Sequence, residues 1–383
     1  MKLRNPYMHF GLLIFILFFV IVMSSPDTAV ADLQLLNNNL PTSELDTNEG
    51  LITARGNNPQ WDAAPLPWSL ARMEAAQAYP LPEMDSLPGL SVNMMQSGSE
   101  PVYIPSVPPE ESQVDEFSGV ESTNQSVQSV EGYDYPAPYT RYENFDSYQV
   151  FPYSTIGVLF FSQRGVDRRC SAAVVGKNAL WTAGHCVHDS SGEPEGWSEN
   201  LVFIPAYKDG ETPYGIWTSN DIATKSAWYS SGDLRYDMGG VFLNPNASFQ
   251  SIQEVVGTLG FAYNLNPIQH WFNFGYPSLS PFDGKTMQIC SGSFAYEDIS
   301  KQNPSPIAMG CDMKGGSSGG AWIINFNGST SGNYINGNNS FRTNNRPEEI
   351  YSPYFGDAAK DLFNFIAIEA TVHLPIIISS DNQ

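Results

Sequence analysis

The chain has 383 residues, of which 42% are hydrophobic and 13% aromatic, and its formal net charge at pH 7 is −22. This length allows two domains of ordinary size or one large domain with an extended appendage. The charge argues against a nucleic-acid-binding protein, because binding to phosphates depends on clustered Lys and Arg. The acidity is concentrated in residues 32–150, which hold 18 Asp and Glu against three Arg, a balance of −15.

The first predicted element is a secretory signal peptide, residues 1–31. Lys2 and Arg4 precede the apolar run Gly11 to Met23 (GLLIFILFFVIVM), and small and polar residues follow it up to Ala31. A charged start, a short apolar segment and an Ala-x-Ala site are typical of a signal peptide cleaved after Ala31. The run is shorter than the roughly 20 residues that a membrane-spanning helix needs. We therefore expect a secreted, extracellular protein that has no membrane attachment after signal cleavage.

Residues 32–145 are predicted to form a poorly ordered acidic region. Pro, Ser, Asn, Gln and acidic residues dominate it, and its apolar stretches are too short to offset the entropy lost on ordering. One helix is expected within PWSLARMEAAQAY, from Pro67 to Tyr79. The region is either a propeptide that is removed or a permanent spacer. Arg141, in PYTRYEN, is the predicted processing point.

From Phe151 onward the sequence predicts an all-β domain. Short runs rich in β-branched and aromatic residues recur between turn signals, which is typical of an antiparallel barrel or sandwich. The predicted strands are TIGVLFF (155–161), SAAVVG (171–176), ALWTA (179–183), LVFIPAY (201–207), GGVFL (239–243), VVGTLGFAY (255–263), WFNFGY (271–276) and AWIINF (321–326). A helix is predicted over 357–370, because Leu362, Phe365, Ile366 and Ala370 fall on one helical face.

The four cysteines fit a secreted protein with two disulfides. Four cysteines allow three pairings, and we expect the sequential one, Cys170 with Cys186 and Cys290 with Cys311. None of them stands in a C-x-x-C motif and no histidine cluster lies beside them, so no structural zinc site is expected.

His185 is the histidine whose surroundings suggest catalysis. It stands in LWTAGHCV, where a predicted strand ends in a turn of small residues that Cys186 can tether to Cys170. A histidine held in this way has little orientational freedom, as a general base beside a nucleophile requires. The other histidines lie in the signal peptide or in no comparable motif, and we interpret them as structural; they are His9, His188, His270 and His373.

The stretch CDMKGGSSGGAWI, residues 311–323, places Ser317 and Ser318 among four glycines. A serine that attacks a carbonyl needs a base, and the oxyanion that forms needs backbone N–H donors directed at one point. Such donors converge only where the chain turns without obstruction by Cβ atoms, so glycines are expected around the serine. A flexible polar turn is the simpler alternative.

LWTAGHC (180–186) and GGSSGGAW (315–322) resemble the His and Ser motifs of chymotrypsin-like serine peptidases, in particular the secreted microbial trypsin-like and glutamyl-endopeptidase-like branch. The resemblance implies two six-stranded antiparallel β-barrels with a C-terminal helix, over residues 146–372, followed by a tail at 373–383. It also implies a serine endopeptidase that forms an acyl-enzyme on protein or peptide substrates, with no cofactor and no metal. We expect a monomer.

The resemblance assigns a role to each matching residue. Ser318, which precedes Gly-Gly, is the nucleophile, and His185 is its base. Asp237, at the start of YDMGGVFL, is the carboxylate that holds His185. Asp221 and Asp233 are the alternatives, but neither leads directly into an apolar strand.

The resemblance also covers the oxyanion hole and the route of activation. The N–H groups of Gly316 and Ser318 are the expected oxyanion donors. Ser317 stands where many relatives have the Asp that pairs with the new N-terminus when a zymogen is activated. If this chain is a zymogen, its activation is therefore expected to work differently.

Asp312 is the candidate residue for substrate selection. It lies six positions before the nucleophile, the spacing that in trypsin places a carboxylate in the primary pocket and selects Lys or Arg at P1. Lys314 stands where trypsin has a cysteine, so Glu-directed or broader cleavage is the alternative. Gly337 and Asn338, in YINGNNSF (334–341), are expected to form another wall of the pocket and to bind substrate.

A different class of function is a catalytically inert binding or adhesion module on the same fold. Inert relatives usually lack one of the three catalytic residues, whereas this chain has candidates for all of them. The sequence therefore favours the peptidase over the inert module.

Overall fold

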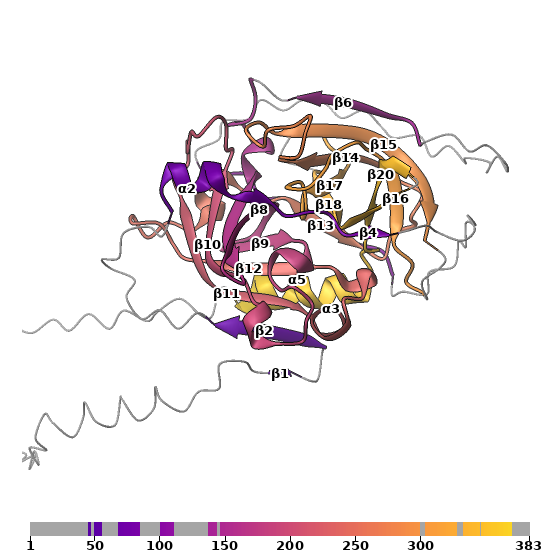
Figure 1. Ribbon diagram of the computed structural model, residues 1–383. Coiled ribbons are helices and arrows are strands. Elements are labelled where there is room, and N and C mark those ends of the chain that lie inside the picture. The colour runs from indigo at the N-terminus through magenta and orange to yellow at the C-terminus, as the bar shows by residue number, and fades with distance from the viewer. Residues whose placement is uncertain are drawn as a thin grey trace, which may run out of the picture. The chain divides into compact units, whose positions relative to one another are not determined.

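The computed structural model describes residues 45–46, 50–55, 68–84, 100–110, 137–143, 146–298, 303–327, 332–344 and 346–369. The predicted signal peptide and the tail at 373–383 lie outside the described residues. All the described residues belong to one unit of the chain. Most of this unit is built from two β-sheets (Figure 1).

The first sheet contains a closed barrel. Its strands are β1 (Leu45–Asp46), β2 (Leu51–Arg55), β3 (Gln77–Ala78), β7 (Ile156–Gln163), β8 (Val166–Gly176), β9 (Ala179–Thr182), β10 (Glu199–Pro205), β11 (Trp217–Lys225) and β12 (Gly239–Leu243). The order β11-β10-β7-β8-β9-β12 returns to β11 because β11 also pairs with β12. Every residue of β7 is buried, which explains why its sequence is a continuous apolar run.

The second sheet has 11 strands. They are β4 (Glu83–Met84), β5 (Val102–Ile104), β6 (Tyr139–Glu143), β13 (Gly260–Tyr263), β14 (His270–Gly275), β15 (Gln288–Glu297), β16 (Ile307–Gly310), β17 (Ala321–Ile324), β18 (Tyr334–Asn338), β19 (Phe341–Thr343) and β20 (Arg346–Ser352). One hydrophobic cluster includes Phe160 and Trp181 from the first sheet and Phe261 and Phe274 from the second. The two sheets therefore share a core, and the predicted all-β class is confirmed.

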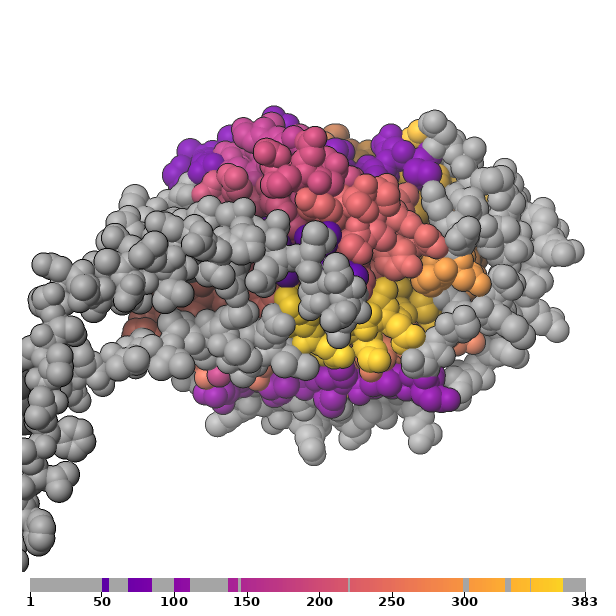
Figure 2. All heavy atoms as spheres, turned by 90° about the horizontal axis from the view of Figure 1, so that it is seen from below, coloured from indigo at the N-terminus to yellow at the C-terminus, as the bar shows by residue number. Residues whose placement is uncertain are grey.

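The helices of the described residues are short, except at the C-terminal end. They are α2 (Leu70–Ala75), α3 (Ser226–Ser231), α4 (Ile252–Val256), α5 (Asp357–Glu369) and the 3-10 turns η1 (Tyr153–Thr155), η2 (Gly184–Cys186), η3 (Pro194–Gly196) and η4 (Leu234–Tyr236). The predicted C-terminal helix is confirmed by α5, whose Leu362 and Ile366 are fully buried in the shared core. Figure 2 shows the C-terminal part of the described chain, in yellow, on one face.

The strand predicted over 255–263 is wrong in its first part. Residues 255 and 256 end helix α4, which begins with a capping box in which Ser251 and Glu254 bond to each other's backbone N–H. The strand itself, β13, is confined to the last four residues of the prediction.

Described segments of the region 32–145 pair with both sheets. β2 pairs with β11 and β3 with β8, whereas β4, β5 and β6 pair with β19, β13 and β15. The helix predicted over 67–79 is present in shortened form as α2, capped by Ser69. Composition predicted little stable structure here because segments of two to five residues are too short to show a periodic pattern. Their hydrogen bonds are completed by strands of the domain.

Candidate active site

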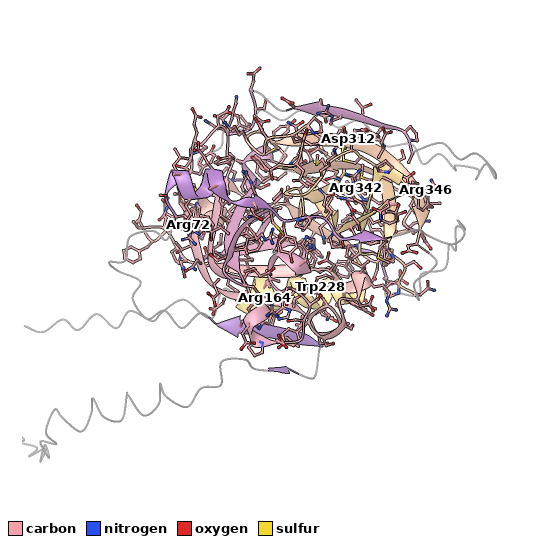
Figure 3. All side chains as sticks on the ribbon, viewed as in Figure 1. Arg72, Arg164, Trp228, Asp312, Arg342 and Arg346 are labelled. Carbon is pink, nitrogen blue, oxygen red and sulfur yellow. A yellow bond between two sulfur atoms is a disulfide. The ribbon has the colours of Figure 1, made fainter. Side chains whose placement is uncertain are left out.

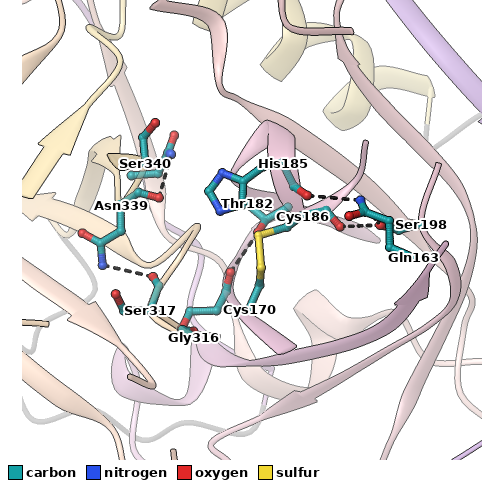
Figure 4. Close-up of a disulfide and its surroundings, with 12 residues drawn as sticks. Gln163, Cys170, Thr182, His185, Cys186, Ser198, Gly316, Ser317, Asn339 and Ser340 are labelled. Carbon is teal, nitrogen blue, oxygen red and sulfur yellow. Dashed lines mark hydrogen bonds between the residues drawn. A yellow bond between two sulfur atoms is a disulfide. The ribbon is translucent and has the colours of Figure 1, made fainter. Parts of the chain in front are cut away.

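The His185 turn is fixed at the end of β9. His185 is the middle residue of η2, directly before Cys186, and its side chain is almost fully buried. Cys186 forms a disulfide with Cys170 on β8, and Cys290 pairs with Cys311, so the expected sequential pairing is confirmed. Figure 4 shows the His185 ring beside the first disulfide, turned toward the loop of Ser317. The turn therefore has little freedom to move away from β8.

Asp237 binds His185 through both carboxylate oxygens. Oδ1 accepts the backbone N–H of His185 at 2.8 Å, and Oδ2 lies 2.8 Å from its ring Nδ1. Because a carboxylate can only accept, Nδ1 carries the proton and Nε2 is left as the basic nitrogen. Asp237 is fully buried. Asp233, one of the alternatives, pairs instead with Arg235 at 2.6 Å.

The serine loop has a conformation that requires glycine at two positions. Gly316 has φ +93°, and a Cβ there would lie 2.5 Å from Ser278 Oγ. Gly319 has φ +76°, and a Cβ there would lie 2.1 Å from Thr182 Oγ1. Both φ values disfavour other residues, and both contacts are too short for real atoms. Gly319 thus lets the loop pack directly against the end of β9, two to three residues before His185, and Gly316 lets it pack against Ser278.

Ser318 lies on this loop, fully buried, and its carbonyl accepts the N–H of Ser171 on β8 at 2.7 Å. Two buried polar atoms of the site, Ser318 Oγ and His185 Nε2, have no hydrogen-bond partner among the described residues. The two atoms are the donor and the acceptor that a serine nucleophile and its base would use. Ser317 differs, because its hydroxyl donates to the Lys314 carbonyl at 2.8 Å.

Two residues that the sequence analysis did not single out support the site. Ser340 donates its hydroxyl to Asp237 Oδ2 at 2.5 Å. Asn339 donates from Nδ2 to the Ser317 carbonyl at 3.1 Å, and its Oδ1 accepts from Asn273 and from Trp322. Its backbone also bonds to Gly319 and Gly320. Both residues belong to YINGNNSF (334–341), the segment whose sequence predicts a wall of the substrate pocket. No local sequence signal predicts that Ser340 binds Asp237 or that Asn339 holds the serine loop.

The predicted substrate-binding residues Gly337 and Asn338 lie buried in β18. Asn338 Oδ1 accepts the Trp181 indole N–H at 3.1 Å, and its Nδ2 donates to the Asp237 carbonyl at 3.3 Å. A Cβ on Gly337 would lie 2.8 Å from Ser352 Oγ. The side-chain contacts of Asn338 therefore point into the domain, toward the residues that carry the site.

Asp312 is already paired. Its Oδ2 lies 3.2 Å from Nε of Arg141, on β6, and both side chains are about one-third exposed. A second cation, Arg342, is 8% exposed and donates to the Met313 carbonyl at 3.2 Å. Burial lowers the pKa of Arg342, and nearby carboxylates, Asp312 among them, oppose this shift. Figure 3 shows Asp312 and Arg342 on the side of the second sheet.

Two groups of described residues bring three potential metal ligands together, Cys170 with His185 and Cys186, and Cys290 with Cys311 and Asp312. In both groups the cysteines are joined as a disulfide, so they offer no thiolate to a metal. The described residues also contain no helix long and apolar enough to cross a membrane.

A closed β-barrel beside a second large sheet, with a buried His–Asp pair and a glycine-flanked serine, defines a chymotrypsin-like serine peptidase. Two solved structures agree. The thermostable serine protease AL20 from an extremophilic microorganism is 32% identical, with a TM-score of 0.52 over 56% of this chain and 97% of that one. The protease Anisep from Arthrobacter nicotinovorans is 31% identical, with a TM-score of 0.53 over 60% of this chain and 100% of that one. The chain belongs to this family.

Curated sequences match over shorter stretches. The glutamyl endopeptidase of Bacillus licheniformis is 29% identical over 143 residues, 37% of this chain and 40% of that protein. The extracellular metalloprotease of Bacillus subtilis is 31% identical over 75 residues, 20% of this chain and 23% of that protein. The chain thus spans less than half the length of these relatives. No protein-family model matches the sequence.

Proposed function

We propose that this chain is the precursor of a secreted serine endopeptidase whose catalytic residues are His185, Asp237 and Ser318. The buried pair of His185 and Asp237, beside the glycine-flanked Ser318, is the observation that carries the proposal. The orientation of this pair leaves Nε2 of His185 as the base, and Ser318 Oγ has no competing partner among the described residues.

In the proposed mechanism, Ser318 Oγ attacks the substrate carbonyl carbon while His185 Nε2 takes the hydroxyl proton. Asp237 stabilises the imidazolium that forms. The N–H groups of Gly316 and Ser318 stabilise the oxyanion, and His185 then gives its proton to the leaving amine. Water, activated by His185, hydrolyses the resulting acyl-enzyme and releases the second product.

We further propose that residues 146–372 form the peptidase domain and that the region 32–145 is a propeptide, removed up to Arg141 by cleavage after that residue. Arg141 lies in the middle of β6, which pairs with β15. The strand therefore has to separate from β15 before a peptidase can bind it as an extended chain. Sequencing the N-terminus of secreted material tests this site, and a start far from Tyr142 would contradict it.

Asp312 is proposed to select Lys or Arg at P1. Its carboxylate is paired with Arg141 in the precursor, and cleavage after Arg141 would remove that partner. Arg342 supports the alternative, a preference for acidic residues, because it is a nearly buried cation near Asp312. A peptide-library profile of the processed protein decides between them. Basic specificity that is lost in Asp312→Asn supports Asp312, whereas cleavage after Glu or Asp assigns the selection to Arg342.

A fluorophosphonate probe tests the activity itself. The processed protein should gain the mass of the probe on the peptide that contains Ser318, and it should cleave unfolded protein substrates. A processed protein that is neither labelled nor active would instead be the inert binding module.

A further inference from the structure

Residues 77–84, which we call the crossing segment, pass from the first sheet to the second over the candidate catalytic residues. At the start of the segment, Gln77 and Ala78 form β3, which runs parallel to β8. At its end, Glu83 and Met84 form β4, which runs parallel to β19. In Figure 1 the indigo chain can be followed from α2 across the molecule to β4.

The backbone of the crossing segment occupies an expected oxyanion donor. The N–H of Gly316 donates to the carbonyl of Tyr79 at 3.0 Å, and the N–H of Tyr79 donates to the carbonyl of Arg169 at 3.0 Å. On the second sheet, the N–H of Arg342 donates to the Pro82 carbonyl, also at 3.0 Å. The Tyr79 carbonyl therefore lies where the proposed mechanism puts the carbonyl oxygen of a substrate.

Two side chains of the segment cover the base and the expected pocket. The ring of Tyr79 lies 4.8 Å from the ring of His185, centroid to centroid. Burial, and then the charge of Asp237, raises the pKa of Tyr79 to about 12, so its phenol is uncharged at neutral pH. Leu81 is 5% exposed and belongs to the hydrophobic cluster that contains Cys311 and Met313, the neighbours of Asp312.

The direction of the segment is opposite to that expected of a substrate. The disulfide between Cys170 and Cys186 joins β8 to the His185 turn. In the proposed mechanism the leaving amine takes its proton from His185, so the half of a substrate that follows the cleaved bond lies on the β8 side of the site. The half that precedes the bond then lies on the opposite side, along β19. In the crossing segment the earlier residues lie on β8 and the later ones on β19.

We propose that the crossing segment keeps the precursor inactive by binding the substrate site in the reverse direction. The inference rests on the proposed function. In this direction the Tyr79 carbonyl accepts from the Gly316 donor, and the nitrogen of Pro80, which continues the chain toward β19, is expected on the side of that carbonyl away from His185. We therefore expect the bond between them to resist cleavage, because His185 would not be placed to protonate that nitrogen. Pro80 and Pro82 also restrict the backbone and lack an N–H.

An upstream anchor holds the segment on the first sheet. The guanidinium of Arg72, in α2, makes two bonds of 2.7 Å to Asp167 on β8. Trp68 donates its indole N–H to the Asn200 carbonyl at 2.7 Å, and Met73 is 2% exposed in the shared core. Figure 3 shows Arg72 at this end of the segment. A cut after Arg141 leaves these contacts intact but removes the covalent link, so the freed segment becomes an inhibitor that dissociates on dilution.

Fluorophosphonate labelling of secreted full-length protein tests the inhibition, with the full-length and processed bands quantified separately. The full-length wild-type band should label much more slowly than the processed band. Leu81→Asp places a carboxylate in the apolar cluster and should speed labelling of the full-length band by about tenfold to a hundredfold. Leu70→Asp is the matched control, because Leu70 is 52% exposed in α2, and should change nothing.

Arg72→Ala is a second variant, outside the hydrophobic core, and should also speed labelling of the full-length band. It keeps the test decisive if Leu81→Asp is not secreted. Equal labelling of the two wild-type bands would overturn the inhibition. If neither band is labelled and the processed protein is inactive, the proposed function fails instead.

A synthetic peptide of residues 68–84 tests the direction. Added to the processed enzyme, it should inhibit cleavage of a small substrate competitively and stay intact by mass spectrometry, whereas a scrambled peptide should not inhibit. No competition at millimolar peptide would overturn the binding. Cleavage of any bond within 77–84 would overturn the reverse direction, because it would mean that the segment binds as a substrate.

Discussion

The two serines of CDMKGGSSGGAWI give the sharpest test of the site, because they are adjacent and chemically identical. The Ser318 hydroxyl and the Nε2 atom of His185 are both buried, and neither has a hydrogen-bond partner among the described residues. Ser318→Ala removes the nucleophile. Because the residues of such a triad act as a unit, we expect kcat/KM to fall by about a millionfold, to the background of the assay.

Ser317→Ala is the matched control. The Ser317 hydroxyl donates to the Lys314 carbonyl at 2.8 Å, and removing one neutral hydrogen bond costs about 1 kcal/mol. Even if the whole cost fell on the transition state, kcat/KM would drop by less than about tenfold.

Processed protein of each variant is assayed on the peptide of the library that the wild type cleaves best. Labelling with the fluorophosphonate probe measures how much active serine peptidase each preparation contains, so that activity from contaminating peptidases can be subtracted. Both variants should give the same far-UV circular dichroism as the wild type. The assignment is refuted if Ser317→Ala loses activity as completely as Ser318→Ala. The assignment is also refuted if Ser318→Ala retains activity.

Three further predictions follow from the contacts of the site. Ser340→Ala removes a charge-assisted hydrogen bond of about 1.5–3 kcal/mol to Asp237, so kcat should fall by about tenfold to a hundredfold with KM little changed, as steady-state kinetics can show. Asn339→Ala removes three side-chain hydrogen bonds and leaves the buried indole N–H of Trp322 without its acceptor, so urea denaturation should show a loss of roughly 3–6 kcal/mol. The pKa of Tyr79 is raised to about 12 in the bound segment, so its ionisation above about pH 10, the pKa of a free tyrosine, favours release. Labelling of full-length protein should therefore accelerate as pH rises from 10 to 12, and Tyr79→Phe should abolish that component of the pH dependence.

Much of the candidate site could be predicted from local sequence. His185, Asp237 and Ser318 each stand at a junction of a strand and a turn, and such junctions are visible in short windows as apolar runs directly after or before small residues. The helix α5 was predictable for the same reason, since its period repeats over 13 residues. The sequence left three disulfide pairings open, and the structure confirms the sequential one that we expected.

Only the tertiary structure decided how distant segments meet. The bond from Ser340 to Asp237 joins residues 103 positions apart, and Arg141 reaches Asp312 because β6 pairs with β15. The crossing segment is the clearest case. The sequence of residues 77–84 shows no strand pattern. Most of the hydrogen bonds of this segment are made by backbone atoms, which every residue except proline carries in the same form, so they leave no trace in the choice of side chains. Side-chain patterns determine which residues can do chemistry, whereas the pairing of backbones decided which segment covers them.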